Sequence, residues 1–367
     1  MNVGTYNFDC FRYEYFTDTT AAFEALKAGV YLFHEEFFSA LWATGYDFPA
    51  LDNGWVKRET IGDDRASGAQ GFWLNLRKEK FQDRRVREAI GMMFNFEWSN
   101  ETLFYGLYER TDSFWENSEL QASGMAEGEE LAVLDPFRAQ LPETVFTEEA
   151  YAPPVSTNRK TDRRLVRQAN TLLEEAGWTI GDDGLRRNAA GEVLSVEILD
   201  DGPAFERIAL PFIENLKLLG IDASWELIDP AQYEQRQEDF DYDVVIGRFA
   251  LSVSPSVELN TLFGSDSADR PGTFNLSGVK DPVIDSLIEQ VIAAEDRDTL
   301  TTRVKALDRV LRDRLIWVPN WYKGSHWIAY WDVFGFPDEK PPYDRGTDYW
   351  WFDQAKYDAL VAAGALR

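Results

Sequence analysis

Residues 71–90, GFWLNLRKEKFQDRRVREAI, hold the clearest structural pattern in this chain. An apolar, aromatic strand at 71–76 runs into a polar turn. Asp83 follows, at a position where its carboxylate can accept hydrogen bonds from the first N–H groups of a helix. Val86 and Ile90 then recur at helical spacing. The stretch therefore predicts a strand, a turn and a helix capped by Asp83.

The net negative charge of the chain disfavours two kinds of binding partner. The chain has 367 residues, long enough for two or more lobes rather than a single core. It carries 64 Asp and Glu against 37 Lys and Arg, a formal net charge of −27. Nucleic acids and anionic membrane surfaces attract basic proteins, so this charge disfavours both as partners. We expect a globular protein that binds no nucleic acid and does not insert into a membrane.

Cysteine and histidine, which are common in catalytic and metal centres, are scarce in this chain. Cys10 is the only cysteine, so an intrachain disulfide and a cysteine metal site are excluded. The two histidines are His34 and His326, and Phe38 stands where a zinc-protease helix would place its second histidine. We expect both histidines at the surface or at the edge of a cleft. No phosphate loop, dinucleotide fingerprint or nucleophile elbow occurs in the sequence, and we expect no catalytic residue, metal or cofactor.

Strand and helix patterns alternate along the chain, which favours a mixed α/β fold. Gly29 and Gly220 stand where a left-handed residue ends a helix, and a glycine-rich turn at 181–184 predicts a hairpin within 178–199. The predicted helices are 20–28, 83–102, 163–176, 205–219, 282–294 and 298–314. The predicted strands are 12–16, 30–33, 71–76, 192–199, 221–227, 239–248 and 316–322.

The strand, turn and helix of residues 71–90 resemble the signature segment of the family 5 extracellular solute-binding proteins. These proteins are the peptide-binding components of ABC importers. The resemblance extends over essentially the whole chain. Finer stretches are similar to the YejA-like branch, which is associated with import of oligopeptides and of the peptide-nucleotide antibiotic microcin C. These stretches are 94–98, 102–106, 110–120, 229–233, 247–255 and 350–353.

The resemblance implies a fold and a place of action. It implies a periplasmic-binding-protein type II-like fold, with two lobes of mixed sheets joined by crossover strands. Residues 1–74 would form part of lobe one, 75–320 the large second lobe, and 321–367 the return to lobe one. Family members carry a signal peptide and further lobe-one segments before the equivalent of position 1. The chain therefore looks like a carboxy-terminal fragment of a periplasmic protein, with the amino-terminal part of the family fold missing.

The resemblance also implies that the protein binds a ligand by enclosing it and does not catalyse a reaction. A peptide or peptide-like ligand is captured between lobes and delivered to the permease subunits of an inner-membrane ABC importer, so the protein is not an enzyme. Aromatic side chains on the crossover strands between the lobes either pack in a core or contact the ligand, and the sequence does not decide between these two roles. Trp98, Trp225 and Trp317 are expected in the core. The residues expected to contact ligand are Trp73, Asn75, Phe114, Arg248, Phe249, Ser252, Ser254, Trp321 and Tyr322.

One departure from the family pattern concerns the amino end of the ligand. Members that bind a free peptide amino group carry Gly-Trp-x-x-Asp, whereas residues 247–252 here read GRFALS, with Leu251 in place of the anchoring aspartate. An ammonium buried without a partner is penalised. We therefore predict a ligand whose amino end is blocked, acylated or held outside. Arg248 either supplies a positive charge for an anionic or carbonyl-rich group or forms an ion pair with a neighbouring acid such as Asp243.

Two other classes of function remain as alternatives. One is a glycan-binding or glycan-hydrolysing protein with an aromatic platform, which would need two carboxylates at a defined separation. The other is a purely structural interaction module. Neighbouring permease and ATPase genes would favour the importer component, and hydrolytic turnover would favour the glycan enzyme.

Overall fold

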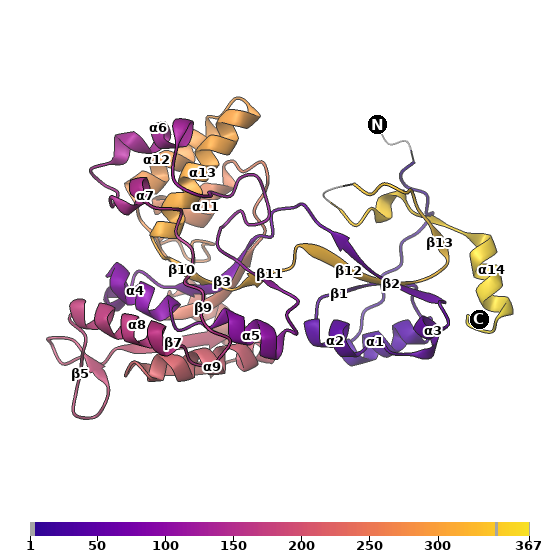
Figure 1. Ribbon diagram of the computed structural model, residues 1–367, viewed down its shortest axis with the longest axis horizontal. Helices are drawn as coiled ribbons and strands as arrows, with labels where there is room; N and C mark the ends of the chain where they lie inside the picture. Colours follow the sequence, from indigo (N-terminus) through magenta and orange to yellow (C-terminus); the bar gives the residue numbers. More distant parts are fainter. Residues whose placement is uncertain (1–3, 342–343, 367) are drawn as a thin grey trace. The chain divides into compact units, whose positions relative to one another are not determined.

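The computed structural model describes residues 4–341 and 344–366. The chain divides into two compact units. The smaller comprises Met1–Arg65, Phe104–Leu107 and Lys323–Arg367, and the larger comprises Ala66–Leu103 and Tyr108–Tyr322 (Figure 1). The assignment of residues 1–74, 75–320 and 321–367 to the lobes of the family fold stays a prediction.

The smaller unit is built on a three-stranded antiparallel sheet in the order β1-β12-β2. Trp327 of β12 stacks on Trp42 of α2, with ring centroids 5.7 Å apart and planes inclined by 9°. This stacking joins a helix to the sheet and closes an apolar core. The elements of the unit are α1 (Thr19–Lys27), β1 (Phe33–Glu36), α2 (Ser39–Thr44), α3 (Pro49–Asp52), β2 (Val56–Gly62), β12 (Ser325–Trp331), β13 (Phe334–Gly335), η5 (Thr347–Tyr349), β14 (Trp351–Phe352) and α14 (Gln354–Ala362).

Two predicted strands of this unit need correction. Helix α1 is confirmed: Asp18 caps it by accepting from the Ala21 amide, and Gly29 ends it with φ +69°. The Val30 amide donates to the Ala25 carbonyl and so belongs to the end of this helix, which is why β1 begins only at Phe33 rather than at 30. The predicted strand 12–16 is wrong. Its residues are exposed and pair with no strand of the described chain, and alternation alone does not supply a partner.

The larger unit contains a five-stranded sheet in the order β10-β3-β9-β7-β8. Strands β10, β3 and β9 pair antiparallel, whereas β7 lies parallel to both β9 and β8. The elements around the sheet are β3 (Ala69–Leu74), η1 (Glu79–Phe81), α4 (Arg84–Gly91), α5 (Phe96–Leu103), β4 (Glu109–Arg110), α6 (Gly128–Leu134), η2 (Asp135–Phe137), α7 (Thr144–Thr147), α8 (Arg163–Glu175), β5 (Thr179–Ile180), β6 (Arg186–Arg187), β7 (Ser195–Asp200), η3 (Pro203–Phe205), α9 (Glu206–Lys217), β8 (Asp222–Leu227), α10 (Pro230–Glu238), β9 (Val244–Phe249), α11 (Glu258–Phe263), η4 (Ser265–Ser267), α12 (Pro282–Ile292), α13 (Arg297–Asp313), β10 (Trp317–Pro319) and β11 (Trp321–Tyr322).

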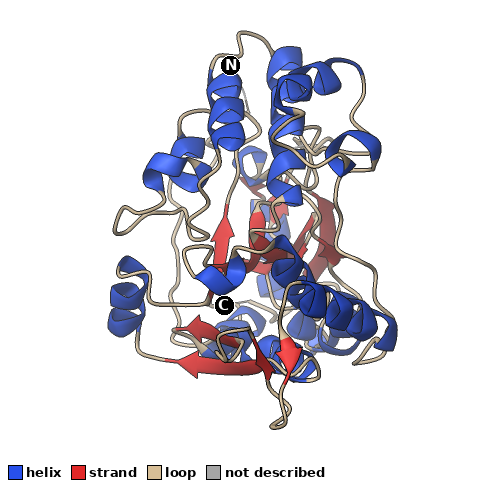
Figure 2. Cartoon of the chain, turned by 90° about the vertical axis from the view of Figure 1, so that its left-hand side faces the viewer, coloured by secondary structure: helices blue, strands red, loops and turns tan. Residues whose placement is uncertain are grey.

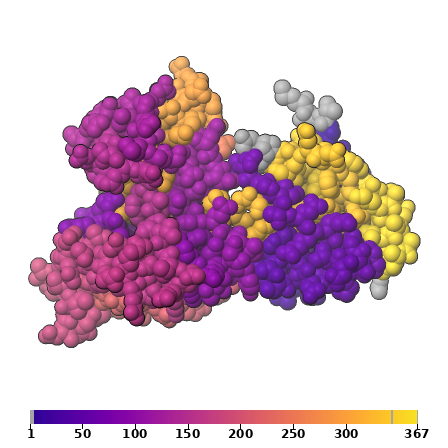
Figure 3. Space-filling view, in the orientation of Figure 1, coloured from indigo at the N-terminus to yellow at the C-terminus, as the bar shows by residue number. Residues whose placement is uncertain are grey.

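Helices cover both faces of this sheet (Figures 1 and 2), and β3 in its interior is buried on both sides, whereas the edge strand β8 is largely exposed. Phe72 packs against Phe94 and Phe212 on the face of α4, α8 and α9. On the opposite face Trp73 and Trp317 belong to the core shared with α11, α12 and α13. In the space-filling view the segment around α6 and α7 and the segment of α8 and α9 form the outer surface over these two faces (Figure 3). Alternate side chains of β3 thus join two cores.

The signature segment forms as predicted, but its helix is divided. Asp83 accepts a 2.8 Å hydrogen bond from the Arg85 amide and caps α4. The predicted helix 83–102 is in fact α4 and α5 with a break between them. Asn95 causes the break, because its Oδ1 accepts from the Trp98 amide at 2.9 Å while its Nδ2 donates to the carbonyl of Arg159. The side chain therefore starts a new helix and ties it to a distant loop.

Most other predicted elements are confirmed with shifts at their ends. The hairpin turn joins β5 to β6, but the strand predicted at 192–199 is not the second strand of that hairpin: it forms β7, which pairs parallel with β8 and β9. Four predicted helices correspond to α8, α9, α12 and α13. The strand predicted at 239–248 begins only at Val244, and the one predicted at 316–322 divides at Asn320 into β10 and β11. Trp317 is enclosed as predicted, whereas Trp98 and Trp225 are only half-buried.

The burial of His326 corrects one further expectation. His326 is 3% exposed, so its predicted place at the surface or a cleft edge is wrong. The carboxylates of Glu35 and Asp63, at 2.7 and 3.3 Å from its ring nitrogens, are the partners that make this burial possible. His34 is half-buried. Within the described residues, no helix is long and apolar enough to cross a membrane, and no cluster of acids, histidine or cysteine could hold a metal ion.

Candidate functional site

Strand β9 lies at the centre of the larger sheet, and it contains a glycine, Gly247. Gly247 stands opposite Gly71 of β3. A Cβ on Gly247 would lie 2.5 Å from Leu276 Cδ1 and 2.9 Å from Trp73 Nε1, so only glycine fits there. Trp73 Nε1 donates to the Gly247 carbonyl at 3.1 Å. The indole therefore fixes the strand from which Arg248 and Phe249 emerge.

Two of the aromatic residues expected to contact ligand lie in the core of the larger unit. Trp73 is 1% exposed and Phe114 is 0% exposed. Their rings are 6.1 Å apart, and Phe114 stacks on Trp317 at 4.6 Å. Phe249, which is half-buried, packs its ring 5.1 Å from that of Trp73. The structure gives Trp73 and Phe114 a packing role, and their contact with a ligand stays a prediction.

Asn75 is fully buried at the end of β3. Its Nδ2 donates to the carbonyls of Phe240 and Tyr242 at 3.0 and 2.9 Å. Its Oδ1 accepts from Arg77 Nη1 at 3.0 Å. The amide thus ties the end of β3 to the segment that leads into β9, and its predicted role as a ligand contact remains to be tested.

The chain beyond β9 brings polar groups to the surface of the larger unit. Arg248, Ser252 and Ser254 are all exposed. The Ser254 amide donates to Ser252 Oγ at 2.9 Å, and the Ser252 carbonyl accepts from Trp115 Nε1 at 3.1 Å. These hydrogen bonds hold the loop, and the side chains of Arg248, Ser252 and Ser254 are exposed to solvent.

The alternative role considered for Arg248, an ion pair with Asp243, is wrong. Asp243 is 2.7 Å from Lys80 Nζ and accepts a hydrogen bond from the Glu197 amide at 3.0 Å. Leu251, which the resemblance places at the family's anchoring aspartate, is 6% exposed and packs in the core. The end of β9 thus offers an exposed cation and no carboxylate at the anchor position.

Trp321 and Tyr322 lie together on a short two-stranded ribbon, where β11 pairs with β4. Trp321 is half-buried, and its ring stacks on Phe205 at 5.8 Å. Tyr322 Oη donates to Glu109 Oε2 at 2.8 Å. Burial, this hydrogen bond and neighbouring acids raise the pKa of the Tyr322 hydroxyl, so it stays protonated and can donate at neutral pH.

Sequence reasoning missed three polar residues of the same ribbon: Arg110, Thr111 and Asn320. Thr111 and Asn320 are 0% exposed, yet Thr111 Oγ1 and both amide atoms of Asn320 have no hydrogen-bond partner among the described residues. Arg110 Nε is likewise buried without a partner within the described chain. Buried polar atoms are nearly always paired, so such a group of exceptions needs an explanation. The available signal was a polar residue, Asn320, inside an apolar strand.

Two cavities of the larger unit lie away from these residues. A groove of about 480 Å³ is lined by Arg77, Arg87, Lys280 and Arg314, among others. Arg314 pairs with Asp281 at 2.6 Å, and Lys280 pairs with Asp269. None of the predicted ligand contacts lines this groove.

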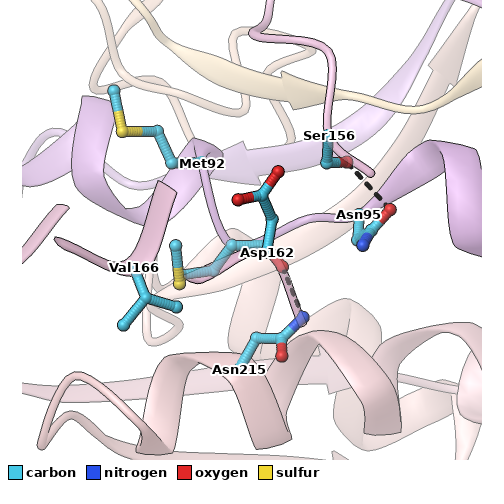
Figure 4. Close-up of a pocket in the computed structure, with 7 residues that line it drawn as sticks. Met92, Asn95, Ser156, Asp162, Val166 and Asn215 are labelled. Atoms are coloured by element: carbon cyan, nitrogen blue, oxygen red, sulfur yellow. Dashed lines mark hydrogen bonds between the residues drawn. The ribbon is translucent and has the colours of Figure 1, made fainter. Parts of the chain in front are cut away.

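A second cavity, beside Asn95 and Asn215, is too small for a ligand. Its volume is about 10 Å³, which is room for about one water molecule. Ser156 Oγ donates to Asn95 Oδ1 at 2.8 Å, and Asn215 Nδ2 donates to the Met93 carbonyl at 3.1 Å (Figure 4). Its polar side chains therefore join α5, α9 and the loop before α8.

Comparison with known sequences places these features in a family. A model of the bacterial extracellular solute-binding proteins, family 5 Middle, matches residues 2–270. The chain is 40% identical over 358 residues to the probable peptide-binding protein YejA of Agrobacterium fabrum, covering 97% of this chain and 58% of that protein. It is 36% identical over 364 residues to YejA of Escherichia coli, covering 99% of this chain and 60% of that protein. The chain thus spans somewhat more than half the length of these relatives, and the predicted resemblance to the YejA-like branch is confirmed.

A solved structure agrees with the fold. The oligopeptide-binding protein AppA of Bacillus subtilis, in complex with a nonapeptide, is 18% identical with a TM-score of 0.65, covering 92% of this chain and 59% of that chain. The predicted fold class, mixed α/β of the periplasmic-binding-protein type II-like kind, is confirmed. Because the family model covers well over half of the chain, the chain belongs to the family 5 bacterial extracellular solute-binding proteins.

Proposed function

We propose that this chain is the substrate-binding component of an ABC importer, acting in the periplasm on oligopeptides or peptide-like compounds. The observation that carries the proposal is the family match over residues 2–270 together with identities of 36–40% to YejA proteins. The Agrobacterium relative is named a probable peptide-binding protein, and AppA holds a nonapeptide. The captured compound is handed unaltered to permease subunits in the inner membrane.

The larger unit supplies one part of the ligand site. Arg248, Ser252 and Ser254 present a cation and two hydroxyls at the end of β9, where Phe249 adds an aromatic surface. Trp321 and Tyr322 add a second aromatic surface, and Tyr322 also adds a hydroxyl donor. Mostly apolar walls with a few fixed polar groups are what recognition of a peptide requires.

The ligand we propose has a blocked amino end, as in a formylated or microcin C-like peptide. Leu251, packed in the core, offers no partner for an ammonium at the anchor position. A charge-assisted hydrogen bond contributes about 1.5–3 kcal/mol, and a free amino end would go without it there.

Titration calorimetry with a formylated tetrapeptide and its free-amine twin tests both parts of the proposal. We expect the formylated peptide to bind more tightly and to be recovered intact by mass spectrometry. Tighter binding of the free amine would reject the blocked-end part alone. Cleavage of the peptide, or no binding of either form, would reject the importer component.

A further inference from the structure

The groove of about 480 Å³ in the larger unit lies at the opposite end of β3 from the proposed ligand contacts. Strand β3 ends at Leu74, and Leu76 and Arg77, which follow it, line the groove. At the other end of the strand Ala69 pairs with Phe249. The strand rises about 3.3 Å per residue, so its two ends lie roughly 17 Å apart. The groove is therefore distinct from the surface around Phe249.

The charged side chains that line this groove are mainly cationic, although the chain as a whole has a formal net charge of −27. Positive charge gathered in a concave surface focuses the electric field and attracts anions. The lining cations outnumber the lining carboxylates by two. The cations are Arg77, Arg87, Lys280 and Arg314, and the carboxylates are Asp269 and Asp281.

Arg87 of α4 is the lining cation with the fewest charged partners. It is 7% exposed. Its Nε donates to the Arg314 carbonyl at 3.0 Å, and its Nη1 donates to the Phe81 and Gln82 carbonyls at 2.6 and 2.8 Å. These neutral acceptors fix the plane of the guanidinium. Among the described residues Arg87 forms no ion pair and its Nη2 donates to no acceptor, so Nη2 is the part of the side chain left for a ligand in the groove.

Arg77 and Lys280 share one carboxylate at another side of the groove. Arg77 Nε is 3.9 Å from Asp269 Oδ1, and the other oxygen of Asp269 pairs with Lys280. The guanidinium carbon of Arg77 lies 4.0 Å from the ring centroid of Phe240, and a Cβ on Gly278 would lie 2.5 Å from it. Arg77 is thus closely packed and contributes a fixed charge, whereas Lys280 is exposed and can turn toward a ligand.

The cost of the charge on Arg87 shows that it is incompletely compensated. Burial, with the positive charges of Arg84 and Arg314, lowers the pKa of Arg87 to about 10 against the opposing charges of Asp83 and Asp313. The guanidinium still stays protonated at neutral pH. An anion in contact with it would offset both the burial and the repulsion between the arginines.

We propose that this groove is a second binding site of the chain and takes a small phosphate monoester. The proposal does not depend on the proposed function. At neutral pH such a phosphate carries close to two negative charges, which matches the excess of two positive charges in the lining. Arg87 Nη2 and the Lys280 ammonium donate charge-assisted hydrogen bonds to its oxygens. A volume of about 480 Å³ is in the range of small-molecule sites, so the organic part of the ester lies beside Leu76 and Val279.

The first test uses the unaltered 367-residue chain at constant ionic strength. Phosphorus NMR titrations with glucose 6-phosphate and with inorganic phosphate are compared, and calorimetry measures binding of glucose. We expect saturable binding of one glucose 6-phosphate per chain, tighter than that of inorganic phosphate, and no binding of glucose. Absence of saturable binding would overturn the proposal. Inorganic phosphate bound as tightly as the ester, or glucose bound alone, would show that the groove does not take a phosphate monoester.

The second test locates the site by changing one charge at a time. Gln82→Glu places a carboxylate at an exposed position of the lining and should lower affinity for glucose 6-phosphate at least tenfold, and Lys280→Gln should lower it about tenfold. Gln232→Glu and Lys217→Gln, both exposed and outside the groove, are the matched controls and should stay within about twofold. Equal weakening in the controls would mean that the ester is held only by the overall charge, and would overturn the proposal.

The third test separates this groove from the peptide site. Affinity for a formylated tetrapeptide is measured with and without saturating glucose 6-phosphate, and we expect it to change by less than about twofold. Displacement of the peptide would overturn the second site and leave the proposed function standing. Glucose 6-phosphate bound by a chain that binds no peptide would do the reverse. Circular dichroism melts show that each variant is folded, and if Lys280→Gln is not, Gln82→Glu decides.

Discussion

Trp73 Nε1 and the Gly247 carbonyl oxygen, 174 residues apart in sequence, are joined by a hydrogen bond of 3.1 Å. The bond runs across the antiparallel pair of β3 and β9, so the same indole both fills the core and orients the strand that ends at Arg248. This position explains why a tryptophan from the signature segment matters for the site even though it is almost fully enclosed.

Gly247→Ala should destabilise the larger unit by about 1–3 kcal/mol, because the new methyl group would press on Leu276 and on the Trp73 indole. Urea unfolding followed by tryptophan fluorescence measures the change. Gly91→Ala is the control: nothing lies within 4 Å of the added Cβ, and alanine favours the end of α4. Equal stability of the two variants would show that the approach of Trp73 to Gly247 is not tight.

Asn75 and Asn320 are both fully buried but should respond oppositely to replacement by leucine. Asn75→Leu leaves the carbonyls of Phe240 and Tyr242 without donors and should cost about 3 kcal/mol of unfolding free energy. Asn320→Leu removes two polar atoms that have no partner in the described chain, and should raise the unfolding free energy by about 1 kcal/mol. Chemical unfolding of the two variants side by side checks the signs. Destabilisation by both would mean that Asn320 is paired in solution.

The elements that could be predicted from the sequence are those whose signals are local. Helices α8 and α13 follow Asp162 and Asp296, each of which accepts from amides of the first turn, and their apolar spacing is regular. The break before α5 could not be predicted, because Asn95 begins that helix through bonds to Thr157 and Arg159 in a distant loop. Strand pairing is equally non-local, so the alternation of residues 12–16 does not make them a strand.

The candidate site shows the same limit. Sequence proximity suggested Asp243 as a partner for Arg248, but the fold brings Lys80 to that carboxylate instead. A sequence also cannot reveal that Arg110 Nε lacks an acceptor among the described residues, because a missing contact depends on every segment that could have supplied one. The sequence gives the residue types of the ribbon, but only the three-dimensional structure shows that polar atoms of Arg110, Thr111 and Asn320 are buried without a hydrogen-bond partner in the described chain.

Arg248→Gln should separate binding from stability. Arg248 is exposed, so its replacement should change the unfolding free energy by no more than about 0.5 kcal/mol. If its charge contacts an anionic or carbonyl-rich group of the ligand, affinity for a formylated peptide should fall about tenfold. Calorimetry measures the affinity, and Arg207→Gln, exposed on α9, serves as the control. Unchanged affinity in Arg248→Gln would remove this residue from the proposed site.

Arg345→Gln should weaken the smaller unit in a pH-dependent way. Burial raises the pKa of Glu35, but the hydrogen bond with His326 and the charge of Arg345, whose Nη1 is 2.6 Å from Glu35 Oε2, more than offset it, so the pKa lies below its usual value. A carboxyl whose pKa is lowered by folding stabilises the protein above its unfolded pKa of about 4.3, and this stabilisation is lost as pH falls. The variant should therefore lose about 0.5–1 kcal/mol at pH 7, a value limited by the 38% exposure of the Arg345 side chain, and progressively less as pH falls through the folded pKa of Glu35.

Hydrogen exchange of the β12 amides reports the stability of this unit, and NMR titration of the Glu35 carboxyl carbon reports its pKa, which should rise in the variant. Arg12→Gln is the matched control, since Arg12 is 73% exposed and pairs with Glu14 rather than with the Glu35 cluster. A loss of stability in Arg345→Gln that is the same at pH 3 and pH 7 would contradict the linkage. Arg345 would then act through packing, and the charge of Glu35 would be compensated by His326 and Lys323.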